Sequence, residues 1–183
     1  KEDAGPLMPI SNYGAMKLAS EALISAANEA FLKNIVIFRF PNVIGTPASH
    51  GVIYDFINKL KINKNALKIL GDGSQKKPYL HVNDLIEAME FIIKKTYNNQ
   101  KNNIYNIGPN DQGITVKEIA RKVTSIINPK ATLIFGNENR GWVGDVPIFS
   151  YNTDKLKYLG WKKNLTSEGA VSLAIKEIYV QER

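Results

Sequence analysis

The chain alternates helix-like segments with short apolar strands, and this alternation restricts the possible folds more than any other feature of the sequence. Residues 12–33 carry apolar side chains at helical spacing, whereas residues 35–40 form a short, β-branched apolar run that ends at Pro41. An apolar run of this length is typical of a strand that is buried in a parallel sheet. The succession of helix and strand therefore predicts an α/β protein.

The same patterns predict the remaining elements. Helices are expected at about residues 52–60, 83–96 and 116–127, and strands at 67–70, 79–82, 104–107 and 132–135. Thr115, Thr153 and Thr166 are each expected to cap the start of a helix. These strands are too few for a complete dinucleotide-binding sheet, and the sequence contains no glycine-rich turn that leads into a helix and binds pyrophosphate.

Composition excludes several classes of function. Hydrophobic residues make up 44% of the chain and charged residues 22%, which is typical of a folded globular protein. Cysteine is absent, which excludes thiolate nucleophiles and cysteine-bound metals and is compatible with a reducing cytoplasm. Neither histidine has a metal-binding partner pattern, and no apolar run is long enough to span a bilayer. We expect a cytoplasmic protein that binds neither a metal nor a membrane.

The charge of the chain favours an anionic partner. The formal net charge is +7, which suits the diphosphate of a nucleotide sugar as well as it suits nucleic acid. The lysines are scattered along the chain, and neither an aromatic RNA-binding motif nor zinc-finger spacing accompanies them. We therefore expect no nucleic-acid partner.

A tyrosine and a lysine lie four residues apart at the start of the first predicted helix. This spacing places Tyr13 and Lys17 on one face of the helix. A fixed positive charge favours a phenolate, so the lysine suits a tyrosine that exchanges protons. Ser11 is expected to cap the helix, and Gly14 and Ala15 leave space beside the phenol. Such pairs also occur on solvated helix surfaces, so the spacing alone leaves both interpretations open.

Several longer motifs follow one another in a fixed order. They are Ser11–Glu21, Arg39–Gly45, Gly71–Gln75 through His81–Leu85, Tyr105–Gly108, Arg140–Pro147 and Leu159–Trp161. In this order they resemble the extended short-chain dehydrogenase/reductases, and most closely the NAD-dependent nucleotide-sugar epimerases and dehydratases that include UDP-glucose 4-epimerase. The resemblance covers essentially the whole chain but only the later, C-terminal portion of a family member.

The resemblance implies a fold and a domain organisation. The chain would contain the last elements of a Rossmann-type parallel sheet and a small α/β substrate-binding domain. Residues 1–45 would form the C-terminal part of the NAD-binding domain with its catalytic helix, and residues 46–183 mainly the substrate-binding domain with some return elements. The resemblance also implies a homodimer packed through the helix at residues 12–33. The N-terminal NAD-binding half would be missing, so we expect the isolated chain to be inactive.

The resemblance also implies roles for individual residues. Tyr13 would act as acid and base on the sugar 4-hydroxyl while hydride passes between the sugar and the nicotinamide of NAD. Lys17 would bind the nicotinamide ribose, and Phe40 and Pro41 would lie near the nicotinamide. Binding of the UDP-sugar would involve Asn42, Val52, Lys77, Tyr79, Arg140 and Asp145.

Some positions depart from the family pattern. Lys77 replaces the usual arginine and Pro78 the usual acidic residue, which keeps a positive charge but loses the planar guanidinium fork. The spacing between Arg140 and Asp145 also differs from the commonest epimerase pattern. His81 is expected to pack in a strand rather than act as a base.

The sequence leaves the reaction open. UDP-sugar 4-epimerisation is the leading hypothesis, but the same scaffold also serves 4,6-dehydratases, decarboxylases and sugar reductases. A sugar-nucleotide-binding module without catalysis is the second hypothesis. The serine or threonine and the acidic pair that would separate these reactions are expected before Lys1.

Overall fold

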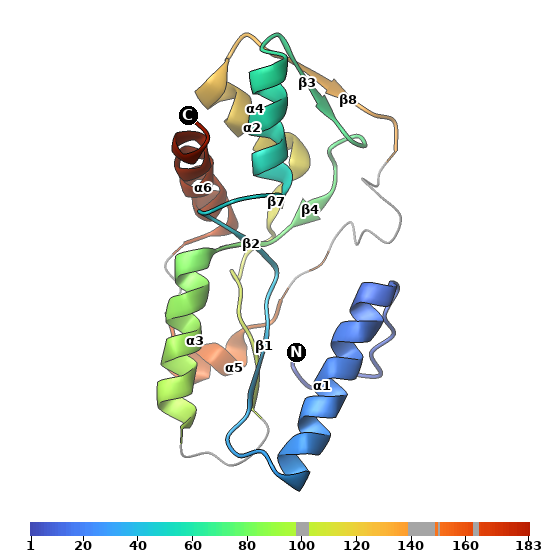
Figure 1. The fold of residues 1–183 in the computed structure, drawn as a ribbon, viewed down its shortest axis with the longest axis vertical. Coiled ribbons are helices and arrows are strands. Elements are labelled where there is room, and N and C mark those ends of the chain that lie inside the picture. The colour runs from blue at the N-terminus through green and yellow to red at the C-terminus, as the bar shows by residue number, and fades with distance from the viewer. Residues whose placement is uncertain (98–102, 139–148, 150, 163–164) are drawn as a thin grey trace.

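The computed structural model describes the whole chain except residues 98–102, 139–148, 150 and 163–164, and it shows two lobes (Figure 1). The upper lobe contains α2 (Val52–Ile62), β3 (Ala66–Ile69), α4 (Val116–Ile127), β8 (Thr132–Phe135) and α6 (Ser167–Gln181). The lower lobe contains α1 (Asn12–Ala30), β1 (Val36–Arg39), α3 (Val82–Thr96), β6 (Asn103–Asn106) and α5 (Asp154–Tyr158). The short strands β2 (Asn42–Ile44), β4 (Lys76–Lys77), β5 (Tyr79–His81) and β7 (Ile114–Thr115) lie where the lobes meet.

Parallel pairing dominates the sheets. In the described part of the chain, β1 pairs with β6, β2 with β5 and β3 with β8 in parallel, while β4 and β7 are antiparallel. Parallel partners need crossover connections, which confirms the predicted α/β class. The sequence analysis did not predict β2, β4 or β7 as strands, because two or three residues are too few to show a period.

Each lobe has its own hydrophobic core. Ile57, Ile119 and Ile175 are fully buried in the upper lobe, one each from α2, α4 and α6. Ile92 of α3 and Leu156 of α5 are equally buried in the lower lobe. The upper lobe is therefore stabilised by three helices that pack on one another.

Strand β5 links the two cores. Its Tyr79 packs into the upper core and the next residue, Leu80, into the lower core. This division follows from the strand itself, since successive side chains point to opposite faces. The connection fixes the lobes to each other at the level of β5.

Helix α1 differs from its prediction. The helix ends at Ala30 rather than near residue 33, and none of its side chains is buried. Leu23 and Phe31, which helical spacing placed on an inner face, are 71% and 75% exposed. The described residues place no apolar layer against this face of α1, so its apolar side chains are not packed into a core.

All four predicted residues stand at helix N-caps, and three of them make a capping hydrogen bond through the side chain. Ser11, Thr115 and Thr166 each accept a hydrogen bond from the backbone N–H three residues later, at 3.1 Å. Thr153 is the N-cap residue of α5, as predicted, but its side chain makes no capping hydrogen bond. Asn152 instead accepts a bond of 3.1 Å from the backbone of Asp154.

Candidate functional site

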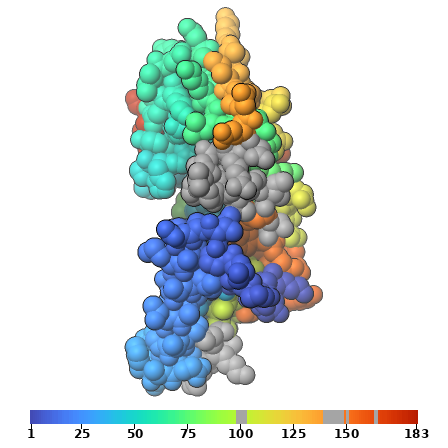
Figure 2. Space-filling model, turned by 90° about the vertical axis from the view of Figure 1, so that its right-hand side faces the viewer, coloured from blue at the N-terminus to red at the C-terminus, as the bar shows by residue number. Residues whose placement is uncertain are grey.

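A cleft of about 870 Å³ lies where the two lobes meet. Its lining comes from the start of α1, the segment from Phe40 through α2, the end of β3, strands β4 and β5, and the start of α4. Figure 2 shows this side of the molecule, with α1 in blue below and α2 in turquoise above. Ligand pockets commonly measure about 300–1,000 Å³, so the cleft is the candidate binding site.

Tyr13 stands at the rim of the cleft and has Lys17 beside it. The Nζ atom of Lys17 lies 5.4 Å from the centroid of the Tyr13 ring. Tyr13 is 71% exposed and lines the cleft, whereas Lys17 lies outside its lining. The geometry brings the two side chains together as the spacing predicted, and their chemical roles remain predictions.

Phe40, Pro41 and Asn42 line the cleft at the carboxyl end of β1. Pro41 is buried, whereas the side chains of Phe40 and Asn42 are exposed. The carboxyl end of a parallel strand is where α/β proteins usually bind ligands. In the register of β2 and β5, Asn42 is the partner of Tyr79, so two predicted substrate residues lie on adjacent strands.

Val52, Lys77 and Tyr79 also line the cleft. The backbone N–H of Tyr79 donates to Ser167 Oγ at 3.2 Å, and this hydroxyl donates to Asp111 Oδ1 at 2.7 Å. These two partners hold the cleft wall at Tyr79. The sequence analysis missed both, because they lie in segments distant from β5 in the chain.

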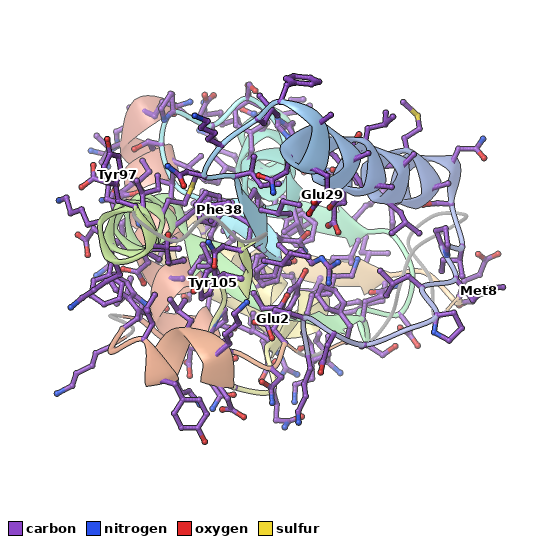
Figure 3. All side chains as sticks on the ribbon, turned by 90° about the horizontal axis from the view of Figure 1, so that it is seen from below. Glu2, Met8, Glu29, Phe38, Tyr97 and Tyr105 are labelled. Atoms are coloured by element: carbon purple, nitrogen blue, oxygen red, sulfur yellow. The ribbon has the colours of Figure 1, made fainter. Side chains whose placement is uncertain are left out.

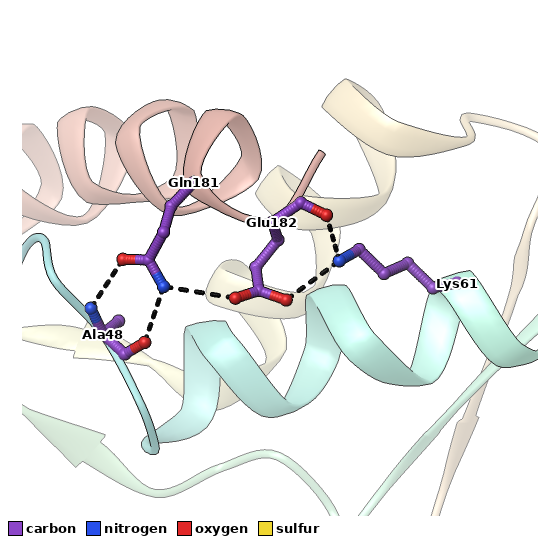
Figure 4. Close-up of polar contacts among 4 residues, drawn as sticks. All are labelled: Ala48, Lys61, Gln181 and Glu182. Carbon is purple, nitrogen blue, oxygen red and sulfur yellow. Dashed lines mark hydrogen bonds and ion pairs between the residues drawn. The ribbon is translucent and has the colours of Figure 1, made fainter.

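The loop between β2 and α2 is held by the end of α6 (Figure 4). The backbone N–H of Ala48 donates to Gln181 Oε1 at 2.7 Å, and Gln181 Nε2 donates to the Ala48 carbonyl at 2.7 Å. Glu182 then pairs with Lys61 of α2 at 2.9 Å. Ala48 lines the cleft, so the last turn of α6 fixes one of its walls.

Helix α1 is attached to β1 by an ion pair. Arg39 donates to both carboxylate oxygens of Glu21, at 2.9 and 2.6 Å. It also donates to the backbone carbonyl of Glu2 at 3.0 Å. The hydrogen bond with Glu21 raises the pKa of Arg39 above its ordinary value. These bonds tie the helix that carries Tyr13 to the strand that ends at the cleft.

The N-terminal arm, which is the segment before α1, contacts strands β1 and β6. Glu2 accepts a bond of 3.0 Å from the backbone of Asn106 in β6, and Figure 3 shows Glu2 close to Tyr105. Burial raises the pKa of Tyr105, and the nearby Glu2 carboxylate raises it further. The arm therefore contributes to the polar attachment of α1.

His81 packs as predicted. It is 1% exposed, and its Nδ1 accepts from the backbone N–H of Asn83 at 3.3 Å. In the neutral ring this leaves Nε2 as the donor to Glu177, at 3.0 Å. Both ring nitrogens are therefore engaged: Nε2 holds β5 against α6, and Nδ1 caps the start of α3.

Two predicted substrate residues, Arg140 and Asp145, lie outside the described residues. Across the part of the chain that is described, no helix is both long and apolar enough to cross a membrane. The same residues contain no group of three or more His, Asp or Glu side chains arranged to hold a metal ion.

The fold and the cleft define the class of protein. It is an α/β protein with parallel strands, a cleft between two lobes and a tyrosine–lysine pair at the rim. The chain belongs to the NAD-dependent epimerase/dehydratase family, because the model of that family matches residues 1–108. The family resemblance inferred from the motifs is thereby confirmed.

Known relatives support the same family. A solved UDP-galactose 4-epimerase is 33% identical with a TM-score of 0.85, and the match covers 98% of this chain and 57% of that one. A putative UDP-glucose 4-epimerase of Methanocaldococcus jannaschii is 29% identical over 164 residues, which are 87% of this chain and 50% of the relative. The mouse dTDP-D-glucose 4,6-dehydratase is 26% identical over 183 residues, with 96% of this chain and 49% of the relative covered.

The chain is shorter than these relatives. It spans about half the length of the archaeal and mouse proteins. It spans 24% of a trifunctional UDP-glucose 4,6-dehydratase, epimerase and reductase of Arabidopsis thaliana, to which it is 29% identical. The match therefore concerns one region of a longer family member.

Proposed function

We propose that this chain is the part of an NAD-dependent UDP-sugar 4-epimerase that binds the nucleotide sugar and carries the catalytic tyrosine. The observation that carries the proposal is the cleft, which gathers Tyr13, Asn42, Lys77 and Tyr79 from separate segments of the chain. The similarity to a UDP-galactose 4-epimerase supports the substrate class.

The residues at the lower end of the cleft fit a nicotinamide riboside. Phe40 is 42% exposed and offers apolar surface to a flat ring, with the buried Pro41 next to it in the cleft lining. Lys17 provides three N–H donors next to Tyr13 for the hydroxyls of a ribose. NAD would therefore be held by Tyr13, Lys17, Phe40 and Pro41, and when bound it supplies the acceptor and the donor of a hydride.

Tyr13 moves the proton in the proposed reaction. Its phenolate takes the proton from the 4-hydroxyl of the sugar as C4 loses a hydride, which leaves a 4-keto sugar. In the return step, the phenol of Tyr13 would give the proton back to O4 of the keto sugar. Lys17, 5.4 Å from the ring centroid, would stabilise the phenolate that exists before the proton is taken and after it is returned.

The remaining residues bind and orient the nucleotide sugar. Lys77 places a positive charge in the cleft for the diphosphate. Asn42 offers an exposed amide beside Tyr79, from which sugar or phosphate oxygens accept hydrogen bonds. Val52 provides apolar contact, and Arg140 and Asp145 complete the proposed set of substrate residues.

A 4,6-dehydratase is the second candidate. The similarity to the mouse dTDP-D-glucose 4,6-dehydratase favours it. The same Tyr13 chemistry would begin that reaction, but the product would have lost one molecule of water. Mass spectrometry of the product therefore separates the two candidates.

Two partners belong to the proposal. The first is an NAD-binding segment with a glycine-rich turn, since this sequence contains no such turn. The second is another copy of the chain, packed through α1. The exposed Met16 and Leu23 of α1, and Phe31 directly after its end, would be covered in a homodimer.

The test is a turnover assay with UDP-galactose. The 183-residue chain is assayed alone and as a fusion behind the NAD-binding segment of a UDP-galactose 4-epimerase. We expect UDP-glucose from the fusion only. Tyr13→Phe in the fusion should lower kcat by about 10²–10⁴-fold, because the proton acceptor is lost.

Tyr158→Phe is the matched control, since this tyrosine is 91% exposed on α5 and outside the cleft lining. It should leave kcat unchanged. Full turnover in the Tyr13→Phe fusion would refute the proposed role of Tyr13. UDP binding to a fusion without any turnover would favour a binding module instead.

A further inference from the structure

Gln75 is a buried polar side chain that has no hydrogen-bond partner among the described residues. It directly precedes β4 and is 3% exposed. Both side-chain atoms that can form hydrogen bonds, Oε1 and Nε2, are screened from solvent, and neither makes a hydrogen bond to the part of the chain that the structure describes. An amide in this state raises the free energy of the folded protein, because its bonds to water have been lost and not replaced.

The backbone at Gln75 is, in contrast, firmly held. Its carbonyl accepts a bond of 3.0 Å from the N–H of Val116, which opens α4. The next residue, Lys76, pairs with Thr115 of β7. The position of Gln75 is thus fixed by the fold, and only its amide is left unsatisfied.

Gln75 lines the cleft at its upper-lobe end. Val116, Ile69 and Leu70 line the same end, whereas Tyr13 and Phe40 come from the lower lobe. Figure 1 shows β4 within the upper half of the molecule and α1 beside the lower half. The unsatisfied amide is therefore on the wall of the cleft that is opposite to the tyrosine.

We propose that Gln75 binds the nucleotide half of the nucleotide sugar. This inference rests on the proposed function, in which the sugar must reach Tyr13 and the nucleotide must therefore extend toward the upper lobe. A uracil or thymine edge and a ribose hydroxyl pair each present a donor next to an acceptor. A glutamine amide, with one acceptor oxygen and two N–H donors, matches that arrangement.

The side chain has the freedom that this role requires. Glutamine has three rotatable bonds, so the amide turns into the cleft when a ligand offers it hydrogen bonds. The ligand then satisfies a group that is unsatisfied in the free protein. Removing the amide should consequently have opposite effects on the two states: the free protein becomes more stable, and the complex becomes weaker.

Gln75→Met tests this opposition, because methionine is also unbranched and keeps the volume of the side chain. We expect the thermal midpoint of the free 183-residue chain to rise by about 2–4 °C. In calorimetric titrations we expect the Kd for UDP to rise about tenfold, the effect of losing one or two hydrogen bonds. Binding of inorganic pyrophosphate, which lacks base and ribose, should not change.

Two further arms locate the contact and control for the loss of a buried polar group. If Gln75 contacts the base, Gln75→Met should weaken the binding of dUDP and of UDP equally. If Gln75 contacts the 2′-hydroxyl of the ribose, the substitution should weaken the binding of UDP but not that of dUDP. Asn28→Leu is the matched control, because Asn28 of α1 also has a buried oxygen without a partner but lies outside the cleft lining. It should leave the Kd for UDP unchanged.

Three outcomes would overturn the inference. A lower thermal midpoint in Gln75→Met would mean that the amide has a structural partner, such as a buried water. An unchanged Kd for UDP, with the wild-type chain binding normally, would refute the contact while leaving the proposed function intact. If the wild-type chain bound neither UDP nor dTDP, the proposed function would fail, and the role of Gln75 with it.

Discussion

Helices α1 and α6 begin in the same way but end up in opposite environments. Each is capped by a hydroxyl side chain, Ser11 in α1 and Thr166 in α6, at the same distance of 3.1 Å. Yet α6 buries six side chains along 15 residues, whereas α1 buries none along 19. Capping therefore decides where a helix starts, and neighbouring elements decide whether its apolar face is covered.

The less buried helix is the one that carries the candidate chemistry. Tyr13 and Lys17 stand on α1, which Glu21, Arg39 and the N-terminal arm attach through polar contacts. The upper lobe, by contrast, has three helices that share one core. The upper-lobe side of the cleft is thus supported by a packed core, while the side formed by α1 depends on a few hydrogen bonds.

The largest loss of stability is expected from a substitution in the hydrophobic core of the upper lobe. Ile175→Ala should lower the free energy of unfolding by about 2–5 kcal/mol, because Ile175 is fully buried and its removal leaves a cavity. Urea unfolding measures the change. Leu23→Ala on α1 is the matched control and should change stability by less than about 0.5 kcal/mol. Equal losses of stability in the two variants would contradict the contrast between the buried helix α6 and the exposed helix α1.

A smaller effect is expected at the attachment of α1. Arg39→Met should cost about 1 kcal/mol, since the pair with Glu21 is bidentate but both side chains remain about one-fifth exposed. The loss should be local, so hydrogen exchange should accelerate in α1 and not in α6. Lys94→Met, which breaks a longer pair of 3.7 Å on the surface of α3, should have no such effect. Unaltered exchange in α1 would show that other contacts hold the helix.

Thr115 and Glu118 form a capping box at the start of α4, in which each side chain accepts a hydrogen bond from the backbone N–H of the other residue. This capping box should contribute a similar amount to the free energy of unfolding, and its contribution should depend on pH. Thr115→Ala should cost about 1 kcal/mol at neutral pH. Hydrogen bonds from Thr115 lower the pKa of Glu118 in the folded chain. This contribution is therefore complete above the unfolded pKa of Glu118 and is lost as pH falls through the folded value.

The control for the capping box is Thr166→Ala. This cap has a glycine, Gly169, where Thr115 has Glu118, so the loss of stability should be similar but without the acid-dependent part. Urea unfolding between about pH 3 and 7 compares the two variants. Identical pH profiles for both would contradict the role of the Glu118 carboxylate.

The smallest change in the stability of the single chain is expected from a substitution on the exposed face of α1. Leu23→Gln should leave the free energy of unfolding unchanged within about 0.5 kcal/mol, because Leu23 is 71% exposed. It should nevertheless weaken the proposed self-association through α1, which sedimentation velocity measures. Ile93→Gln, on the surface of α3, is the control. A destabilised monomer would mean that α1 has an intramolecular partner.

Motifs in the sequence predicted much of the candidate site, but not its supports. Tyr13, Asn42, Lys77 and Tyr79 were found because they belong to motifs that resemble a family. Gln181 and Asp111 support the cleft through hydrogen bonds to segments far away in the chain. No local pattern marks such residues, because their partners become neighbours only when the chain has folded.

The sequence by itself determined the local structure: the alternation of helices and strands, most of the caps, and the spacing of Tyr13 and Lys17. These features depend on residues within a few positions of one another, so periodicity and hydrogen-bonding capacity are sufficient to predict them. The tertiary structure alone decided which faces are buried, how β5 joins the two cores, and that Gln75 is enclosed at the cleft without a partner. Burial depends on contacts between distant segments, and a one-dimensional pattern does not contain them.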